Sequence, residues 1–214
     1  MLNKTFFVVL IMVILVAAII IGLTTNSIKL EKTAEIKLTK EQIAQANEAL
    51  GPFVNGEDGQ QVNPLSHFFT SYYEKPEYIN LDNMLYIFPS ETNITKEEFE
   101  ALKAHEKWPF GKDAEMDTIP VPIHRISADS VDAALKQYMN ISLEDVVEKE
   151  PESLIFLEEY NAFYNFTSDF AAGFFKCVSG EIKDDTIILY RENAVLTLRK
   201  IDDRYIIVSH IKTK

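Results

Sequence analysis

The sequence predicts an α+β protein: an N-terminal transmembrane helix, then a single domain whose helices pack on a C-terminal antiparallel β-meander. Three observations predict this class. Residues 6–23 form an apolar run without a charged side chain. Helix-capping signals recur between residues 39 and 142. From residue 154 onward apolar residues alternate with polar ones, which is the period of β-strands.

The composition agrees with a folded protein. Of the 214 residues, 47% are hydrophobic and 25% are charged, and a single cysteine rules out a disulfide framework. This length allows one domain, or one domain with an appendage. We therefore expect three parts: residues 1–24 as a signal anchor, residues 25–38 as a stalk and residues 39–214 as the extracytoplasmic domain.

The apolar run, which begins at Phe6 and ends at Leu23, is close to the roughly 20 residues that a helix needs to cross a bilayer. No clear small-residue cleavage signal follows it, which favours a retained anchor over a cleaved signal peptide. The short tail before the run is typical of a single-pass protein of the cell membrane with its C-terminal domain outside. The lysines that follow the run favour the opposite orientation, with the C-terminal domain inside the cell, and this is the alternative.

Capping residues place the expected helices. Thr39 with Gln42 predicts a helix over residues 40–50, and Thr95 with Glu98 predicts one over residues 95–106. Further helices are expected over residues 80–88, capped by Asn80, and over residues 127–139, and a short turn is expected from Ser142. We expect loops over residues 55–63 and 108–122, and leave the state of residues 65–73 open between strand and helix.

The period-two region predicts the strands of the meander, over residues 162–167, 174–182, 186–190, 194–200 and 205–212. The segments 183–185 and 202–203 read as tight turns. Strands joined this closely must be antiparallel, because a parallel crossover needs a dozen or more residues. Cys177 falls on one of these strands and is expected to be a small buried side chain.

No motif with the spacing of a nucleotide-binding loop, a zinc-protease helix or a nucleophile elbow occurs in the sequence. We therefore assign no catalytic residue, metal ligand or cofactor. The four histidines, His67, His105, His124 and His210, are scattered without the spacing of metal ligands. The pair His124 and Arg125, just before a predicted helix, is the one that we single out as a binding candidate.

The charge excludes one class of partner. Residues 25–214 carry a net charge of −13, which opposes binding to nucleic acid. The most acidic stretch, residues 144–159, lacks the spacing of a calcium loop, so a solvated surface is the simplest interpretation and a surface for cations or basic partners is the alternative.

Aromatic residues concentrate at residues 68–73 and 160–166. Rings beside amide and carboxylate groups suit the binding of a glycan, and the second cluster offers Tyr160, Asn161, Tyr164 and Asp169 as binding candidates. The simpler interpretation is that these rings fill the core between helices and sheet.

Five segments together resemble a family of uncharacterised membrane-anchored or exported proteins of Gram-positive bacteria, whose domain has no assigned activity. They are the sequence around Asn63-Pro64 and Phe68-Phe69, Tyr86-x-Phe88-Pro89, Thr95-x-Glu97-Glu98, Tyr160 to Asp169, and Tyr205 to His210. The resemblance covers most of residues 39–214 and implies a bacterial extracytoplasmic domain. It also implies an Asp where this chain has Asn161.

Two function hypotheses follow. We expect a membrane-tethered extracytoplasmic module that binds an unknown protein, peptide or glycan. The alternative is a cell-surface hydrolase with a dispersed site, drawn from His67, His124, His210, Ser168, Asp169 or the pair Glu158 and Glu159. A histidine that is hydrogen-bonded to a Ser or Asp inside one cleft would favour the enzyme. An exposed aromatic or strand-edge patch would favour binding.

Overall fold

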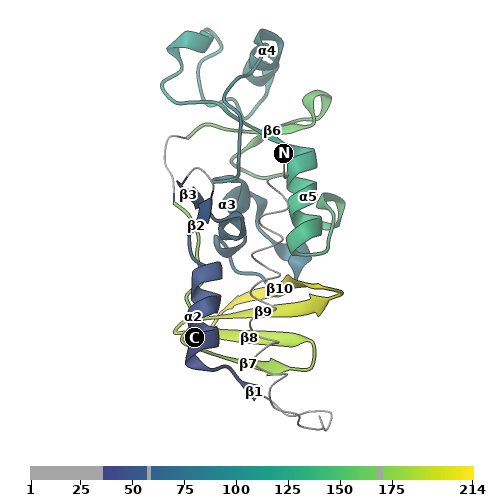
Figure 1. Cartoon of the computed structure of the whole chain (residues 1–214). Coiled ribbons are helices and arrows are strands. Elements are labelled where there is room, and N and C mark those ends of the chain that lie inside the picture. The colour runs from purple at the N-terminus through teal and green to yellow at the C-terminus, as the bar shows by residue number, and fades with distance from the viewer. Residues whose placement is uncertain (1–35, 57–58, 168–170) are drawn as a thin grey trace. The chain divides into compact units, whose positions relative to one another are not determined.

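The computed structural model describes residues 36–56, 59–167 and 171–214 (Figure 1). The regular elements of these residues are helices and antiparallel sheets, so the α+β class is confirmed. The apolar run over residues 6–23 and most of the predicted stalk lie outside the described residues, as do Ser168 and Asp169. Within the described part, no helix combines the length and the apolar character needed to span a bilayer.

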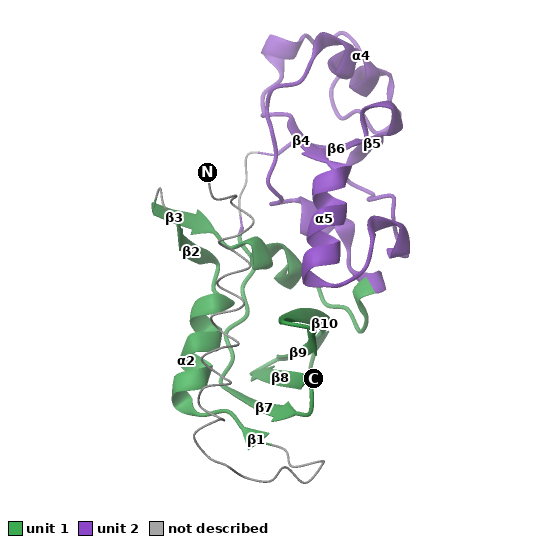
Figure 2. Ribbon diagram, turned by 45° about the vertical axis from the view of Figure 1, so that its right-hand side comes forward, with its two compact units in different colours: residues 1–76, 172–214 green, residues 77–171 purple. Residues whose placement is uncertain are grey.

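The chain divides into two compact units (Figure 2). Unit 1 comprises residues 1–76 and 172–214, and unit 2 comprises residues 77–171. The α-helices are α2 (Lys40–Ala49) in unit 1 and α3 (Leu81–Leu85), α4 (Lys96–Ala104) and α5 (Ala128–Tyr138) in unit 2. The strands of unit 1 are β1 (Ile36–Lys37), β2 (Phe53–Gly56), β3 (Gly59–Val62), β7 (Ser179–Lys183), β8 (Thr186–Arg191), β9 (Ala194–Ile201) and β10 (Arg204–Lys212). Those of unit 2 are β4 (His124–Ser127), β5 (Ile155–Leu157) and β6 (Ala162–Asn165).

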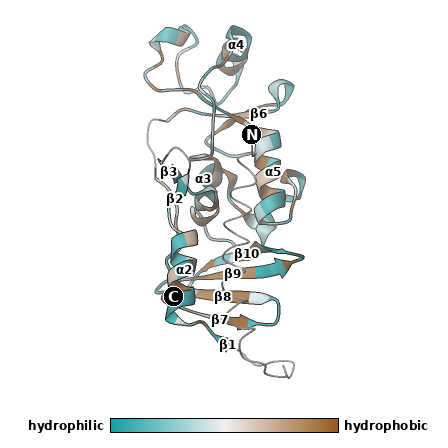
Figure 3. Ribbon diagram, viewed as in Figure 1, coloured by the Kyte–Doolittle hydropathy of each residue, from teal (hydrophilic) through white to brown (hydrophobic). Residues whose placement is uncertain are grey.

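A five-stranded antiparallel sheet in the order β1-β7-β8-β9-β10 forms the C-terminal meander of unit 1, as predicted. Two of its hairpin turns begin at Asp184 and Asp202, whose φ angles of 53° and 52° lie in the left-handed region that Asp tolerates better than most residues. In Figure 3 the strands of this sheet carry hydrophobic segments, whereas the turn between β9 and β10 is hydrophilic. Strand β1 falls at the end of the predicted stalk, so the stalk prediction is wrong for residues 36–37, which pair with β7.

The strand predicted over residues 174–182 starts only at Ser179, which corrects its first half. The backbone before it is paired elsewhere. Phe175 N–H donates to Leu50 O at 3.0 Å, and the Asn47 side chain bonds both the N–H and the C=O of Cys177, at 2.7 and 3.0 Å. Because these bonds replace a strand ladder, Cys177 lies outside the sheet, although it is buried as predicted.

The loop predicted over residues 55–63 is also wrong, because β2 and β3 pair there as a hairpin from Phe53 opposite Val62 to Gly56 opposite Gly59. Gly56 and Gly59, which pair at the end of the hairpin, are of the residue type that tight turns favour. The segment left open, residues 65–73, forms a 3-10 helix over Pro64–Phe69, and the Asn63 side chain accepts a hydrogen bond from Leu65 N–H at its start.

The helix predictions in unit 2 are confirmed in place. Thr95 and Glu98 form the capping box of α4, and the Asn80 side chain caps α3, which ends at Leu85 rather than at residue 88. The strand predicted over residues 162–167 does not join the meander. It is β6, the central strand of a separate sheet in the order β4-β6-β5.

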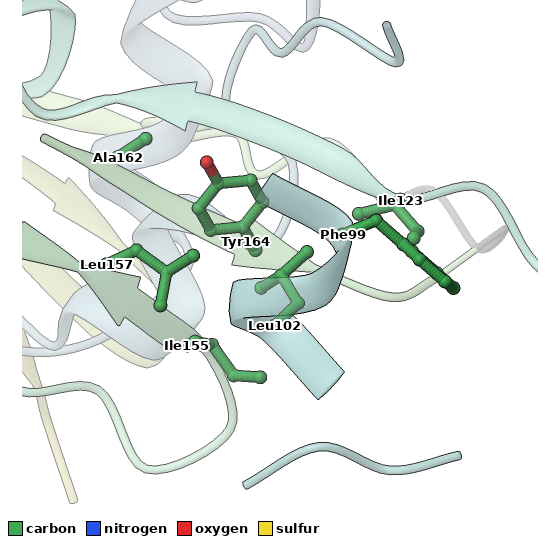
Figure 4. Close-up of a cluster of buried hydrophobic side chains, with 7 residues drawn as sticks. All are labelled: Phe99, Leu102, Ile123, Ile155, Leu157, Ala162 and Tyr164. Atoms are coloured by element: carbon green, nitrogen blue, oxygen red, sulfur yellow. The ribbon is translucent and has the colours of Figure 1, made fainter. Parts of the chain in front are cut away.

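The core of unit 2 gathers between α4 and the strands β5 and β6. Figure 4 shows seven buried side chains with the Tyr164 ring near the middle of the group: Phe99, Leu102, Ile123, Ile155, Leu157, Ala162 and Tyr164. Phe99 and Leu102 lie three residues apart on the helix and so share one face. This cluster holds β6 in place, and β6 in turn holds the neighbouring strand β4.

Candidate functional site

Strand β4 carries His124 and Arg125, the pair that the sequence singles out. It pairs with β6 so that His124 lies opposite Asn165 and Arg125 lies opposite Tyr164. Successive side chains of a strand point to opposite faces. The two side chains therefore enter different surroundings, and each surrounding is a small polar network.

The first network centres on Glu98, which is only 5% exposed. Its Oε1 atom accepts hydrogen bonds from Arg125 Nε at 2.8 Å and from the Tyr164 hydroxyl at 2.7 Å. Its Oε2 atom accepts one from Thr95 N–H at 2.8 Å. Arg125 also donates through Nη2 to Tyr160 O at 3.3 Å. Both carboxylate oxygens of Glu98 are thus engaged within the protein.

These contacts set the charge state of Glu98. Burial alone raises the pKa of its carboxyl, but the hydrogen bonds from Thr95, Tyr164 and Arg125 outweigh burial and bring the pKa below its usual value. Burial and the same carboxylate raise the pKa of the Tyr164 hydroxyl. The network therefore pairs an ionised carboxylate with a guanidinium and a neutral phenol, which is an arrangement that holds the fold rather than one that exchanges protons.

The predicted aromatic cluster is placed in the interior or in turns. The Tyr164 ring is fully buried, and Tyr160 packs against the core of unit 2. Asn161 has a left-handed φ of 46°, and its side chain donates to Asp129 Oδ1 at 2.9 Å. Asp169 lies outside the described residues. Of the predicted binding residues, the structure brings Tyr160, Tyr164 and Arg125 together, whereas His124 faces elsewhere.

The second network joins His124 to Ser90 and Thr167. The Ser90 hydroxyl lies 2.9 Å from His124 Nδ1, and His124 Nε2 lies 2.9 Å from the backbone oxygen of Thr167. A carbonyl oxygen can only accept a hydrogen bond, so Nε2 must carry the hydrogen. In the neutral ring Nδ1 then has only a lone pair, and the Ser90 hydroxyl donates to it.

Backbone pairing fixes this geometry. Glu91 and Arg125 form an isolated antiparallel bridge, in which Glu91 N–H donates to Arg125 O at 2.9 Å and Arg125 N–H donates to Glu91 O at 2.7 Å. This bridge ties the segment of Ser90 to the strand of His124. The sequence carries no signal for the pair, because the two residues lie 34 positions apart and form no local motif.

A cleft of about 280 Å³ opens beside this pair, and we call it the His124 cleft. Its apolar lining comes from Leu85, Ile87, Phe88, Pro89 and Ile126. Its polar lining comes from Tyr86, Ser90, His124, Asn165 and Thr167. None of these described lining residues is an Asp, Glu, Lys or Arg.

The polar lining is held in place by its own hydrogen bonds. The hydroxyl groups of Tyr86 and Thr167 lie 3.0 Å apart, and Asn165 Nδ2 donates to Tyr86 O at 3.2 Å. Ser90 and Tyr86 are exposed, while His124 is half-buried. Ser90 and Tyr86 are thus the exposed polar residues of the cleft lining.

A second, larger cleft of about 650 Å³ is lined by acidic residues, among them Asp82, Glu148, Glu150 and Glu152. The Asp82 carboxylate is already engaged there, because it accepts hydrogen bonds from Glu152 N–H and Ser153 N–H, each at 2.7 Å. The acidic stretch thus uses one of its carboxylates to close a loop. Of its charged side chains, Asp82 is engaged in this loop and Lys149 pairs with Glu144 at 2.6 Å.

The other candidates do not assemble into a site. His210 is buried, and its Nδ1 donates to Ser71 O at 2.7 Å. His105 accepts a hydrogen bond from Lys107 N–H at 3.1 Å through Nδ1. Burial raises the pKa of Cys177, which disfavours the reactive thiolate. Across residues 36–56, 59–167 and 171–214, no three His, Cys, Asp or Glu side chains cluster as metal ligands would.

Comparison with known proteins gives no match: no family model, no curated protein and no solved structure matches this chain.

Proposed function

We propose that this chain is a membrane-tethered binding module that takes an uncharged, hydrogen-bonding ligand, such as a segment of a glycan or of a peptide backbone, in the His124 cleft. The observation that carries this proposal is the composition of the cleft. It combines one apolar wall with five polar residues, and its described lining has no ionised acid or strong base. Such a mixture is typical of sites that bury a mainly neutral ligand and orient it with a few polar groups.

The exposed ring of Tyr86 supports a flat ligand group. Tyr86 is 39% exposed, and its hydroxyl is fixed by the contact with Thr167 at 3.0 Å. A fixed ring beside hydroxyl, imidazole and amide groups can stack on a sugar or a peptide plane while the polar groups bind its edge. An exposed aromatic side chain is the feature that, from the sequence, favours a binding module over an enzyme, and Tyr86 supplies it.

Charge narrows the ligand class. Residues 77–171 contain 7 Lys and Arg against 20 Asp and Glu, a net charge of −13. This potential repels anionic ligands and attracts cationic ones. A neutral ligand, or one with a positive group outside the cleft, fits the unit better than a phosphate or a nucleic acid.

The membrane part of the proposal rests on the sequence. The uncharged run from Phe6 to Leu23 would hold the chain in the cell membrane as a single-pass anchor, with residues 25–214 outside. Fractionation of cells and protease treatment of intact cells test both statements. Recovery in the soluble fraction would refute the anchor, and protection from protease in intact cells would refute the orientation.

The binding test uses the full-length chain in a maltoside detergent on arrays of neutral oligosaccharides and of uncharged peptides. The Tyr86→Ala variant should lose binding, whereas Tyr78→Ala, which removes a 57% exposed ring of the same unit outside the cleft lining, should retain it. Equal binding by the two variants would show that the ligand does not use the cleft.

A second candidate function, a hydrolase, is favoured by one specific observation. The hydrogen bond between Ser90 and His124 lies inside one cleft. A histidine that is hydrogen-bonded to a serine inside one cleft favours an enzyme, although Ser90 is absent from the residues expected from the sequence.

A further inference from the structure

We propose that Ser90 is a nucleophile activated by His124, and that the His124 cleft transfers or hydrolyses the acyl group of small neutral carboxylic esters. The inference uses the same cleft as the proposed binding function and adds a chemical step to it. It stands on three features: the Ser–His hydrogen bond, the backbone carbonyl that orients the ring, and the exposure of the serine beside an uncharged cleft.

The hydrogen-bond chain has a fixed direction. Thr167 O accepts from His124 Nε2, so the lone pair of the neutral ring is on Nδ1, 2.9 Å from Ser90 Oγ. The Ser90 proton therefore points at a base that can remove it. This is the geometry of an activated nucleophile, with a base within hydrogen-bond reach and a third group that orients the base.

The serine is also accessible. Ser90 is exposed, so its oxygen can approach a carbonyl carbon that lies in the cleft. Of the apolar lining, Pro89 is exposed and Phe88 is 8% exposed, and these two side chains can contact a short hydrocarbon acyl group. Asn165 Nδ2 donates one of its two hydrogens to Tyr86 O, and the other can share the negative charge that develops on the carbonyl oxygen.

The acyl group passes first to Ser90 and then to water. Ser90 Oγ bonds to the acyl carbon while its proton moves to His124 Nδ1. The bond between the acyl carbon and the ester oxygen then breaks, and the leaving alcohol takes that proton from His124. Water next attacks the acyl-Ser90 ester, giving one proton to His124. When the bond to Ser90 breaks, that proton returns to Ser90 Oγ, and a carboxylic acid leaves.

The orienting group limits the rate. A neutral carbonyl stabilises the imidazolium that forms on His124 less than the buried carboxylate of a complete triad does. The carbonyl nevertheless keeps the correct tautomer, which is the function whose loss is costly in triads. We therefore expect slow turnover with a detectable covalent acyl-serine, rather than a fast enzyme.

The test measures covalent labelling of the full-length chain in a maltoside detergent with a fluorophosphonate probe. Attack by Ser90 Oγ forms an O–P bond, breaks the P–F bond and releases fluoride, while the proton moves to His124. Intact-mass spectrometry follows the rate, and peptide mapping locates the adduct. We expect one adduct on Ser90, lost in Ser90→Ala and slowed at least about 100-fold in His124→Gln, which is the lower range for a general base.

Two variants in the same unit serve as matched controls. Ser130→Ala removes another exposed serine, and His105→Gln removes another half-buried histidine, whose Nδ1 accepts from a backbone N–H. Both should label at the unmodified rate. The emission spectrum of Trp108, the single Trp of the chain, verifies that each variant is folded.

The outcomes separate this inference from the proposed binding function. Labelling of Ser90 that needs His124, together with hydrolysis of p-nitrophenyl butyrate above the Ser90→Ala background, supports it. An adduct on another residue, no adduct, or equal rates with and without His124 overturns it. Array binding without labelling leaves the binding function alone, and labelling without array binding supports the activity and refutes the binding module.

Discussion

The two faces of strand β4 place neighbouring residues in different surroundings. Arg125 faces a buried network in which both oxygens of Glu98 accept hydrogen bonds, at 2.7 to 2.8 Å. His124 faces a cleft, where its network ends on the exposed hydroxyl of Ser90. A saturated network can only stabilise the fold, whereas a network that ends at the surface has a group left to meet a ligand. The period of the strand therefore separates a network that holds the fold from the one that lines the proposed site.

The largest expected effect on stability comes from the saturated side. Glu98→Gln removes the charge that compensates Arg125, and breaking a buried ion pair costs about 3 to 5 kcal/mol. Because the Arg125 side chain is 25% exposed, we expect the lower end, about 3 kcal/mol. Urea unfolding followed by Trp108 fluorescence measures this loss. The centroid of the Trp108 ring lies 5.5 Å from that of Phe99, the residue next to Glu98.

The matched control for that substitution is Glu97→Gln, which removes an exposed charge from the same first turn of α4. It should change the unfolding free energy by less than about 0.5 kcal/mol. Equal effects of the two variants would mean that the Glu98 network contributes nothing beyond its surface charge.

A smaller effect is expected from Tyr164→Phe. This change removes one hydrogen bond to the Glu98 carboxylate and leaves the ring in the core, so the loss should be about 2 kcal/mol, within the range for bonds to charged groups. The same urea titration measures it. Tyr78→Phe, which removes an exposed hydroxyl of unit 2, should be neutral, and a comparable loss in both would contradict the role of the bond.

Acid should weaken the two units over different ranges of pH. Burial lowers the pKa of His67 in unit 1 from 6.5 to about 4. As the pH drops from 6.5 towards 4, His67 is protonated in the unfolded chain but not in the folded one, so the free energy of unfolding falls over this range. The pKa of Glu98 is also lowered, but from 4.5. The stability that the Glu98 carboxylate contributes is therefore fully present above pH 4.5 and is lost only as the pH falls below that value.

Hydrogen exchange at pH 7, 5 and 4 distinguishes these ranges. Amides of the 3-10 helix that carries His67 should lose protection by pH 5, while those of α4 and β6 should keep theirs. His67→Gln should remove the loss at pH 5, provided that its own protection at pH 7 shows a folded unit. Simultaneous loss in both units would show that His67 does not set the acid response of unit 1.

The elements that the sequence predicts correctly are those that short-range signals determine. The capping boxes of Thr39 and Thr95 and the turns at Asp184 and Asp202 each act within a few residues, and the structure confirms all four elements. Pairings between distant segments could not be predicted this way. Strand β6 lies in a segment predicted as a strand, and all four of its residues are buried, but nothing in its sequence says that its partner is β4 rather than the meander.

The same limit applies to the candidate site. Glu98 is visible in the sequence as a capping residue, yet its partner Arg125 lies 27 positions away. His124 is noticed because it precedes a helix, whereas Ser90 has no local feature that marks it. The tautomer of His124 depends on a backbone oxygen, that of Thr167, which no pattern of side chains can disclose.

The smallest expected effect on stability, and the sharpest test of the comparison, belongs to His124→Gln. The ring is half-buried and its two hydrogen bonds lie at the edge of a cleft, so the unfolding free energy should fall by about 1 kcal/mol at most. Labelling of Ser90 should nevertheless collapse. Glu98→Gln should do the reverse, losing stability while the chain that stays folded labels at the unmodified rate. If instead both variants lose stability and labelling in proportion, the two sides of β4 form one cooperative network, and the separation between fold and site argued from the strand period is wrong.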